Sequence, residues 1–338
     1  NTTGANNVAV GTDALCLNTT GCRNTAVGFQ AGGDNTTGCE NAFFGRLAGC
    51  ENTTGGANTG IGSASFSSNT TGCYNTAIGH SALETNTTAS NNVAVGYRSL
   101  GGNTTGTRNV AIGTCSLLVS TTASDSIMIG HTAGDAITTG TSNTGIGSDV
   151  MTSTTTGGCN TALGISALAA NTTGGTNTSI GFYSLLANTT AGCNTAVGYK
   201  ALCANTTGAC NTAVGRDTLL ATTTGVNNTA IGKTSGSIMA TGDNNTFLGY
   251  DAQPTNSSVS NQITLGNSNN DNLRCADTSI SSLSDLRDKT NIEDIPHGLD
   301  YILAMRPVKF DWNARDGSRE GKKDYGFIAQ ELDQVEET

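Results

Sequence analysis

Apolar residues recur with a fixed period from Asn1 to Gly266. A large apolar side chain stands directly before each of sixteen glycines, which recur at every seventeenth position from Gly11 to Gly266. Because no copy carries an insertion or a deletion, every copy fills the same geometric slot, as in a stacked solenoid. With positions numbered 1 to 17 from Asn1, the consensus is N-T-T-G-x-x-N-T-A-V-G-x-x-A-L-x-x. The pattern predicts a mostly β protein in which residues 1–266 form a β-solenoid of sixteen 17-residue coils.

The residue types at each position predict how one coil is built. Position 10 is apolar in every copy and mostly β-branched, which predicts a buried strand, and position 15 is leucine in eight copies. Positions 9 and 14 are mostly alanine or serine. Positions 4 and 11 hold 28 of the 41 glycines in this region, so we expect both to turn the chain at positive φ. Position 7 is asparagine in fourteen copies, and its amide is expected to bond backbone at a turn or to stack with the amides of neighbouring coils.

The predicted coils are thin. Sixteen of them stacked as parallel strands form a rod about 75 Å long. Each copy supplies only about two large aliphatic side chains, so a single roll buries little apolar surface per residue. We therefore expect several chains to pack side by side, with the alanine and serine positions as candidate contact faces.

Charge divides the chain into two parts. The long repeat region 1–266 contains 18 charged side chains, whereas the much shorter segment 267–338 contains 24. We expect a solenoid shaft or head at 1–266, a connector at 267–283 and a small α+β domain at 284–338 that is incomplete at its C-terminus. Helices are predicted from Ser284, over 298–306 and over 325–335, and a strand is predicted over 307–312.

Composition also limits the partners. The net charge of −10 argues against nucleic acid, because binding a phosphate backbone needs clustered lysine and arginine. No apolar run reaches the roughly 18 to 20 residues needed for membrane insertion, and no motif calls for a cofactor or a metal. The eleven cysteines form no C-x-x-C motif. They are interpreted as small ladder residues, with disulfides, including disulfides between chains, and metal binding as alternatives.

Position 1 generates a series of N-x-S/T sequons. In a protein secreted by a eukaryote these asparagines would be glycan acceptors, and in a phage or bacterial protein they would be turn residues. Glycans on consecutive coils only about 5 Å apart would crowd one another, which favours the turn interpretation. The candidate glycosylation sites are Asn18, Asn35, Asn52, Asn69, Asn86, Asn103, Asn171, Asn188 and Asn205, with further sequons at Asn1 and Asn256.

Two copies of the repeat resemble a known motif. N-V-A-V-G at 7–11 and N-V-A-I-G at 109–113 are similar to the N-S-V-A-I-G of the head repeats of trimeric autotransporter adhesins, whose coils are shorter. N-T-A-V-G arrays also resemble those of tail-fibre-like phage proteins. The resemblance implies a trimeric β-roll.

The C-terminal segment carries a more specific resemblance. S-L-S-D-L-R-D-K, then L-x-x-M-R-P-V-K-F-D-W, then G-F-I-A-Q-E-L resemble, in order, the peptidase S74 family, the intramolecular chaperone of endosialidases and many phage tail fibres. The family implies a domain that trimerises its fibre and then cuts itself off. Its pattern maps the nucleophile to Ser284, the base to Lys289 and the scissile bond to Leu283–Ser284. A serine hydroxyl needs a base, and a desolvated neutral lysine can serve as one.

These observations favour a structural fibre over an ordinary enzyme. We expect a homotrimeric fibre, on a virion or in the extracellular space, that attaches to a host receptor or glycan and carries a chaperone that cuts itself in a single turnover. One alternative is a cellular surface adhesin or secreted glycosylated filament with the same repeat. A glycan-degrading tailspike is disfavoured, because only 11 acidic side chains are spread over the whole of 1–266.

Overall fold

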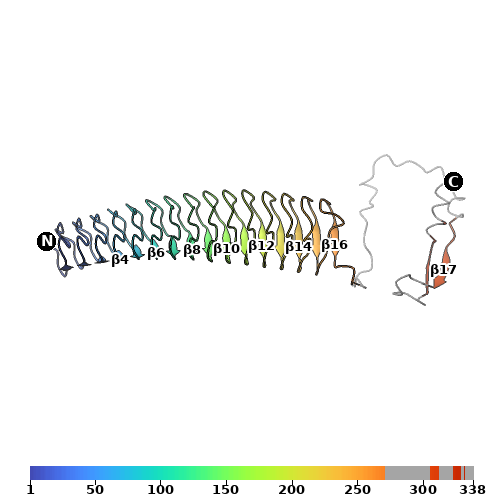
Figure 1. The fold of residues 1–338 in the computed structure, drawn as a ribbon, viewed down its shortest axis with the longest axis horizontal. Coiled ribbons are helices and arrows are strands. Elements are labelled where there is room, and N and C mark those ends of the chain that lie inside the picture. The colour runs from blue at the N-terminus through green and yellow to red at the C-terminus, as the bar shows by residue number, and fades with distance from the viewer. Residues whose placement is uncertain (271–304, 312–322, 329–330, 332–338) are drawn as a thin grey trace, which may run out of the picture. The chain divides into compact units, whose positions relative to one another are not determined.

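The computed structural model describes residues 1–270, 305–311, 323–328 and 331. The chain divides into two units, Asn1–Asn267 and Ser268–Thr338. The first unit is a stack of coils with one short strand in each coil (Figure 1), which confirms the predicted β-solenoid.

One parallel sheet runs the length of the first unit. Its sixteen strands follow one another in chain order, and each residue pairs with its counterpart in the next coil, as Val8 with Thr25 and Val10 with Val27. The strands are β1 Val8–Val10, β2 Thr25–Val27, β3 Ala42–Phe44, β4 Thr59–Ile61, β5 Thr76–Ile78, β6 Val93–Val95, β7 Val110–Ile112, β8 Ile127–Ile129, β9 Thr144–Ile146, β10 Thr161–Leu163, β11 Thr178–Ile180, β12 Thr195–Val197, β13 Thr212–Val214, β14 Thr229–Ile231, β15 Thr246–Leu248 and β16 Ile263–Leu265.

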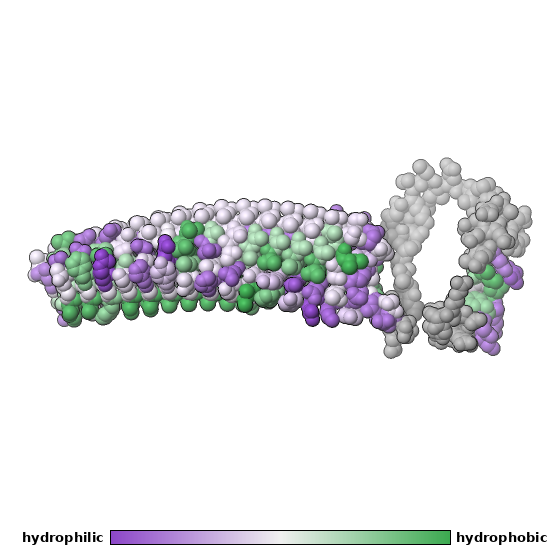
Figure 2. Space-filling model, in the orientation of Figure 1, coloured by the Kyte–Doolittle hydropathy of each residue, from purple (hydrophilic) through white to green (hydrophobic). Residues whose placement is uncertain are grey.

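The prediction that position 10 is buried is wrong. Side chains alternate along a strand, and the middle residue of each strand, at position 9, is the one that points into the coil. Ala77 is therefore fully buried, whereas Ile61 and Leu163 at position 10 are 41% and 45% exposed. Figure 2 shows hydrophobic residues in a row along one edge of the stack.

The interior of the coils is built mainly from positions 9, 14 and 15, with Ile137 and Met239 added from position 1. Alanine or serine at position 14 and leucine at position 15 are buried beside the middle strand residues, as in Ala82 and Leu83. Because positions 9 and 14 lie inside the coil, they cannot be the contact faces between chains that we expected from the sequence.

Bulky residues at position 9 are matched by small residues at position 15. Phe43 is buried at position 9, and the neighbouring occupants of position 15 are Gly32 and Gly49. A Cβ atom on Gly49 would lie 2.5 Å from Cε1 of Phe43, so leucine cannot occupy this site. Phe247 and Gly236 form a similar combination. In these coils the bulk of a phenylalanine at position 9 thus fills the space that leucine occupies at position 15 elsewhere.

The two glycine positions have different causes. Position 11 turns the chain at positive φ as predicted, for example at Gly28 with φ 140°. Position 4 does not adopt positive φ, which corrects the second half of that prediction. Glycine is favoured there because a Cβ atom on Gly21 would lie 2.3 Å from the carbonyl oxygen of Gly38 in the next coil. Positive φ occurs instead at non-glycine residues of positions 6, 13 and 15, such as Leu83 with φ 51°.

Asparagine ladders connect the coils, as predicted for position 7. The backbone N–H of Asn41 donates to Oδ1 of Asn24 at 2.9 Å, and Nδ2 of Asn41 donates to the carbonyl oxygen of Gly55 at 2.9 Å. Both asparagines are buried. These amides supply the hydrogen bonds that turn backbone inside the stack would otherwise lack.

In the second unit the structure describes a two-stranded antiparallel hairpin. Strand β17, Val308–Asp311, confirms the strand predicted over 307–312, and it pairs with β18, Lys323–Gly326. The helix predicted over 325–335 is wrong at its start, because Tyr325 and Gly326 belong to β18; a short apolar run does not separate helix from strand by periodicity. The helix predicted from Ser284 and residues 298–304 lie outside the described residues, and residues 305–306 have no regular structure.

Candidate functional site

The residues expected to carry out self-cleavage, Leu283, Ser284 and Lys289, all lie outside the described residues. The chemistry expected of them remains a prediction from the family pattern.

The candidate glycosylation asparagines form an inner ladder. Nδ2 of Asn35 donates to Oδ1 of Asn18 at 2.8 Å and to the carbonyl oxygen of Gly38 at 3.0 Å. Nδ2 is the atom that a glycan would occupy, and here both of its protons face buried acceptors. The same buried setting holds for all nine candidates: Asn18, Asn35, Asn52, Asn69, Asn86, Asn103, Asn171, Asn188 and Asn205. The folded coil therefore favours the turn-residue interpretation at these positions, whereas Asn256 is exposed.

The ten cysteines in the described part of the chain are free thiols. Several of them take the place of other polar residues in the ladders. The sulfur of Cys39 accepts a hydrogen bond from the backbone N–H of Cys22, and the sulfur of Cys22 accepts one from the backbone N–H of Ala5. The structure thus favours the ladder interpretation of the cysteines.

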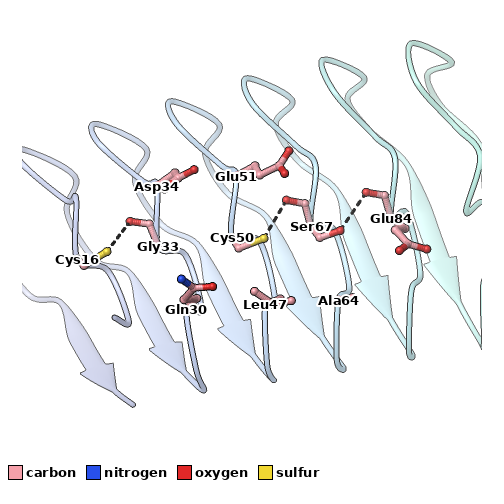
Figure 3. A pocket seen from close by; sticks show the side chains of 10 residues that line it. All are labelled: Cys16, Gln30, Gly33, Asp34, Leu47, Cys50, Glu51, Ala64, Ser67 and Glu84. Atoms are coloured by element: carbon pink, nitrogen blue, oxygen red, sulfur yellow. Dashed lines mark hydrogen bonds between the residues drawn. The ribbon is translucent and has the colours of Figure 1, made fainter. Parts of the chain in front are cut away.

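A hollow of about 420 Å³ lies on the side of coils 1 to 5, lined by residues that include Cys16, Cys50 and Glu51. Figure 3 shows hydrogen bonds stepping from coil to coil along position 16. Sγ of Cys16 donates to the carbonyl oxygen of Gly33, and Sγ of Cys50 donates to that of Ser67. Cysteine and serine play the same structural role at this position.

The thiol of Cys50 is poorly suited to nucleophilic chemistry. Partial burial raises its pKa above the ordinary value, and the negative charge of Glu51 raises it further. The thiolate is the reactive form of cysteine, so this environment keeps Cys50 in its unreactive form at neutral pH. Among the described residues, no group of three histidine, cysteine, aspartate or glutamate side chains is arranged to hold a metal ion.

Chemically varied residues gather at the corner that follows each strand. We call positions 12 and 13 of successive coils the corner ridge. Five of the seven lysines and arginines of residues 1–266 stand there. So do five of the seven aromatic residues that are exposed in the described part of the shaft. These aromatics are Phe29, Tyr97, Phe182, Tyr199 and Tyr250.

Aromatic and basic side chains are most concentrated on the ridge in coils 11 to 15. The rings of Phe182 and Tyr199 are stacked, with centroids 5.7 Å apart and planes 4° from parallel. The guanidinium carbon of Arg216 lies 5.6 Å from the Tyr199 centroid, and Nζ of Lys233 lies 5.4 Å from the Tyr250 centroid. Sequence reasoning missed this surface, although the signal was available: these two positions vary in chemistry while most other positions of the repeat hold constant residue types.

In the second unit, one ion pair joins two of the motifs quoted above. Arg306 of M-R-P and Glu331 of A-Q-E-L are paired, with Nε of Arg306 3.1 Å from Oε2 of Glu331. The hydrogen bond from Arg306 holds the pKa of the Glu331 carboxyl below its ordinary value. Two separate stretches of the C-terminal sequence thus meet at this exposed ion pair.

Residues 284–337 match the family model Peptidase_S74, the chaperone of endosialidase. The resemblance predicted for the C-terminal segment is confirmed. We refer to these residues as the S74-like segment; Arg306, Glu331 and both strands of the hairpin belong to it. No curated protein and no solved structure matches the chain.

The structure also bears on membranes. No helix within the described ranges has the length and the apolar character required to cross a bilayer.

Proposed function

We propose that the protein is a homotrimeric fibre for host attachment, carried on a virion tail or at a cell exterior, whose assembly depends on the S74-like segment. The observation that carries the proposal is the sequence match at 284–337, which follows a sixteen-coil β-solenoid in the same chain. A family of endosialidase chaperones implies trimer formation. A long rod with a low charge density suits repeated weak contacts with a surface, because linked contacts add strongly to avidity.

The exposed side chains of the sheet supply a contact face for the trimer. Position 10 places an aliphatic or aromatic residue outside every coil, and Ile146 and Leu248 are 39% and 37% exposed. Isolated exposed apolar residues are common on proteins, but a continuous row extending over sixteen coils marks an interaction surface. We assign the contacts between chains to this row, in place of the buried alanine and serine positions.

Self-cleavage at Leu283–Ser284 is the proposed chemical step. Lys289, when neutral, takes the proton of the Ser284 hydroxyl, and Oγ attacks the carbonyl carbon of Leu283. The C–N bond breaks, the proton passes to the nitrogen that becomes the new α-amino group, and an ester links Leu283 to Oγ. Water then hydrolyses the ester and leaves a carboxylate on Leu283. Loss of the chaperone gives the fibre kinetic stability, because the released trimer has no assisted route back to the unfolded state.

The experiment expresses the full chain and analyses it by denaturing gel and mass spectrometry. We expect a shortened shaft ending at Leu283 and a small fragment that begins at Ser284. Ser284→Ala should remain full length, and Ser282→Ala, a neighbouring serine, should still be cut. If Ser284→Ala is cut like the unchanged protein, the assignment of the nucleophile is wrong.

The oligomeric state is measured separately, by native mass spectrometry of the unchanged chain and of Ser284→Ala. Both should be trimers, because in the proposed order assembly precedes cleavage. A monomer for the uncut protein contradicts the fibre proposal itself.

A further inference from the structure

The aromatic and basic part of the corner ridge has no role in the folding of the shaft. Tyr199 and Tyr250 are 41% and 58% exposed, and Arg216 is also largely exposed. The coil interior is filled mainly by positions 9, 14 and 15 and does not include these side chains. Exposed rings gathered in one place are uncommon on a surface that is otherwise built of threonine, asparagine and glycine, and such gatherings mark binding surfaces.

Over residues 109–266 the positively charged side chains are confined to the ridge. From residue 109 to residue 266 the only lysines and arginines are Lys200, Arg216 and Lys233, and all three stand on the ridge. Nζ of Lys200 lies 5.4 Å from the Tyr199 centroid, so the cations are interleaved with the rings. In coils 11 to 15 the acidic residues on the ridge are Asp217, which pairs with Arg216, and Asp251. The ridge of coils 11 to 15 therefore carries three cations against two carboxylates, a small positive excess on a chain whose net charge is −10.

We propose that the corner ridge of coils 11 to 15 binds a carboxylated polysaccharide laid along the rod. This inference rests on the proposed function in host attachment and names the class of surface molecule that the shaft would hold. The ridge repeats once per coil, about every 5 Å along the rod. A linear polysaccharide likewise presents the same chemical groups at regular intervals. Each unit of such a chain offers apolar C–H groups to Phe182 and Tyr199, hydroxyls to the tyrosine oxygens, and a carboxylate to Arg216 or Lys233.

Nucleic acid shares part of this chemistry but fits the ridge less well. Single strands stack on aromatic residues, yet they also need a basic groove that follows every phosphate. Three cations spread over five coils do not provide such a groove, and the overall negative charge of the protein opposes binding. A polysaccharide needs fewer cations on the protein, because its hydroxyl and apolar C–H groups also contribute to binding.

The test is affinity electrophoresis of the full chain in native gels that contain alginate, a carboxylated polysaccharide, or dextran, a neutral one. We expect alginate to retard the protein and dextran to leave its mobility unchanged. Tyr199→Ala should weaken alginate binding about tenfold, since it removes the ring that stacks on Phe182 and lies beside Arg216. Arg216→Gln combined with Lys233→Gln should also weaken binding and should flatten its dependence on salt.

The matched control is Tyr74→Ala, which removes an exposed tyrosine at position 6, away from the ridge. It should leave alginate binding unchanged. Equal retardation by alginate and dextran, a Tyr74→Ala loss equal to that of Tyr199→Ala, or tighter binding to a single-stranded oligothymidylate would each overturn the inference. A trimer that ignores alginate overturns the inference alone, whereas a monomer that binds alginate overturns the fibre proposal alone.

Discussion

Nδ2 of Asn103 donates a hydrogen bond to Oδ1 of Asn86 at 2.9 Å, but Oδ1 of Asn103 is buried without a partner. The cause is a break in the inner ladder. Position 1 of the next coil holds Ser120, whose hydroxyl oxygen is also buried without a partner. Where asparagine stands at position 1 in consecutive coils, its amide reaches the oxygen of the preceding coil, as in Asn86 and Asn69.

Ser120→Asn should therefore stabilise the shaft. The new amide gives Oδ1 of Asn103 a donor. Oδ1 of the new side chain faces Ile137 in the following coil and takes the place of the unpaired Ser120 hydroxyl, so the gain is about 1 kcal/mol. The midpoint of denaturant unfolding, followed by circular dichroism, should rise. Thr122→Asn, at a nearby exposed position, should shift stability by less than about 0.5 kcal/mol. A lower midpoint for Ser120→Asn would show that the coil has no room for the amide.

Gly113→Ala should destabilise the shaft strongly. Gly113 adopts φ 130°, a conformation that favours glycine, and a Cβ atom there would lie 2.2 Å from the carbonyl oxygen of Gly130. Strain and clash together should cost about 3 kcal/mol or more in the free energy of unfolding, read from the denaturant midpoint.

The matched control for Gly113 is Gly33→Ala. The nearest atom to a Cβ at Gly33 is the carbonyl oxygen of Gln30 at 3.5 Å, an ordinary contact, and its φ is not positive. This substitution should change stability by less than about 1 kcal/mol. Equal losses from the two substitutions would mean that the turn at position 11 imposes no special constraint.

The period of the solenoid could be predicted from the sequence, but the direction of its side chains could not. Sixteen uninterrupted copies determine the coil and the strand register. Alternation along Thr59–Ile61 means only that Gly60 faces one side of the sheet and its two neighbours face the other. Either side could face the interior, because each carries apolar residues along the stack. The decisive signal is the exchange of volume between Phe43 and Gly49, which shows that positions 9 and 15 share one interior.

The candidate sites divide in a similar way. Ser284 and Lys289 could be proposed because a family motif resembles the sequence around them and suggests their roles, whereas the corner ridge has no motif. Its rings stand one full coil apart in the sequence, so Phe182 and Tyr199 become neighbours only once the coils are stacked. Position 6 also varies and carries the exposed Tyr74. The sequence alone does not say whether position 6 or the ridge is the better candidate for a binding surface.

The reactivity of the thiols should depend on their burial. Burial raises the pKa of both Cys50 and Cys203, so each thiol ionises at higher pH than its ordinary value of about 8.5. Below the ordinary value these thiols stay protonated in folded and unfolded chains alike. As pH rises above it, the unfolded chain loses its thiol protons first, and the folded state loses stability.

The rate of alkylation by iodoacetamide, measured by peptide mass spectrometry at pH values from about 7.5 to about 10, reports how readily each thiol ionises. Cys50 should be labelled more slowly than Cys159, which is exposed. Glu51→Gln removes a charge that raises the pKa of Cys50 and should speed its labelling. Equal rates for Cys50 and Cys159 at mildly alkaline pH would contradict the assignment.

Ile146→Asp tests the row of exposed side chains at position 10. In a single chain this side chain is 39% exposed, so aspartate should be tolerated by the coil and circular dichroism should remain unchanged. In a trimer that buries the row, three unpaired carboxylates would lose water, at a cost of several kcal/mol each. Native mass spectrometry should therefore find monomers. Ile238→Asp, which changes a 53% exposed isoleucine away from the sheet, should leave the trimer intact. If both variants remain trimeric, the chains meet through another face of the shaft, and the apolar row must have a different partner.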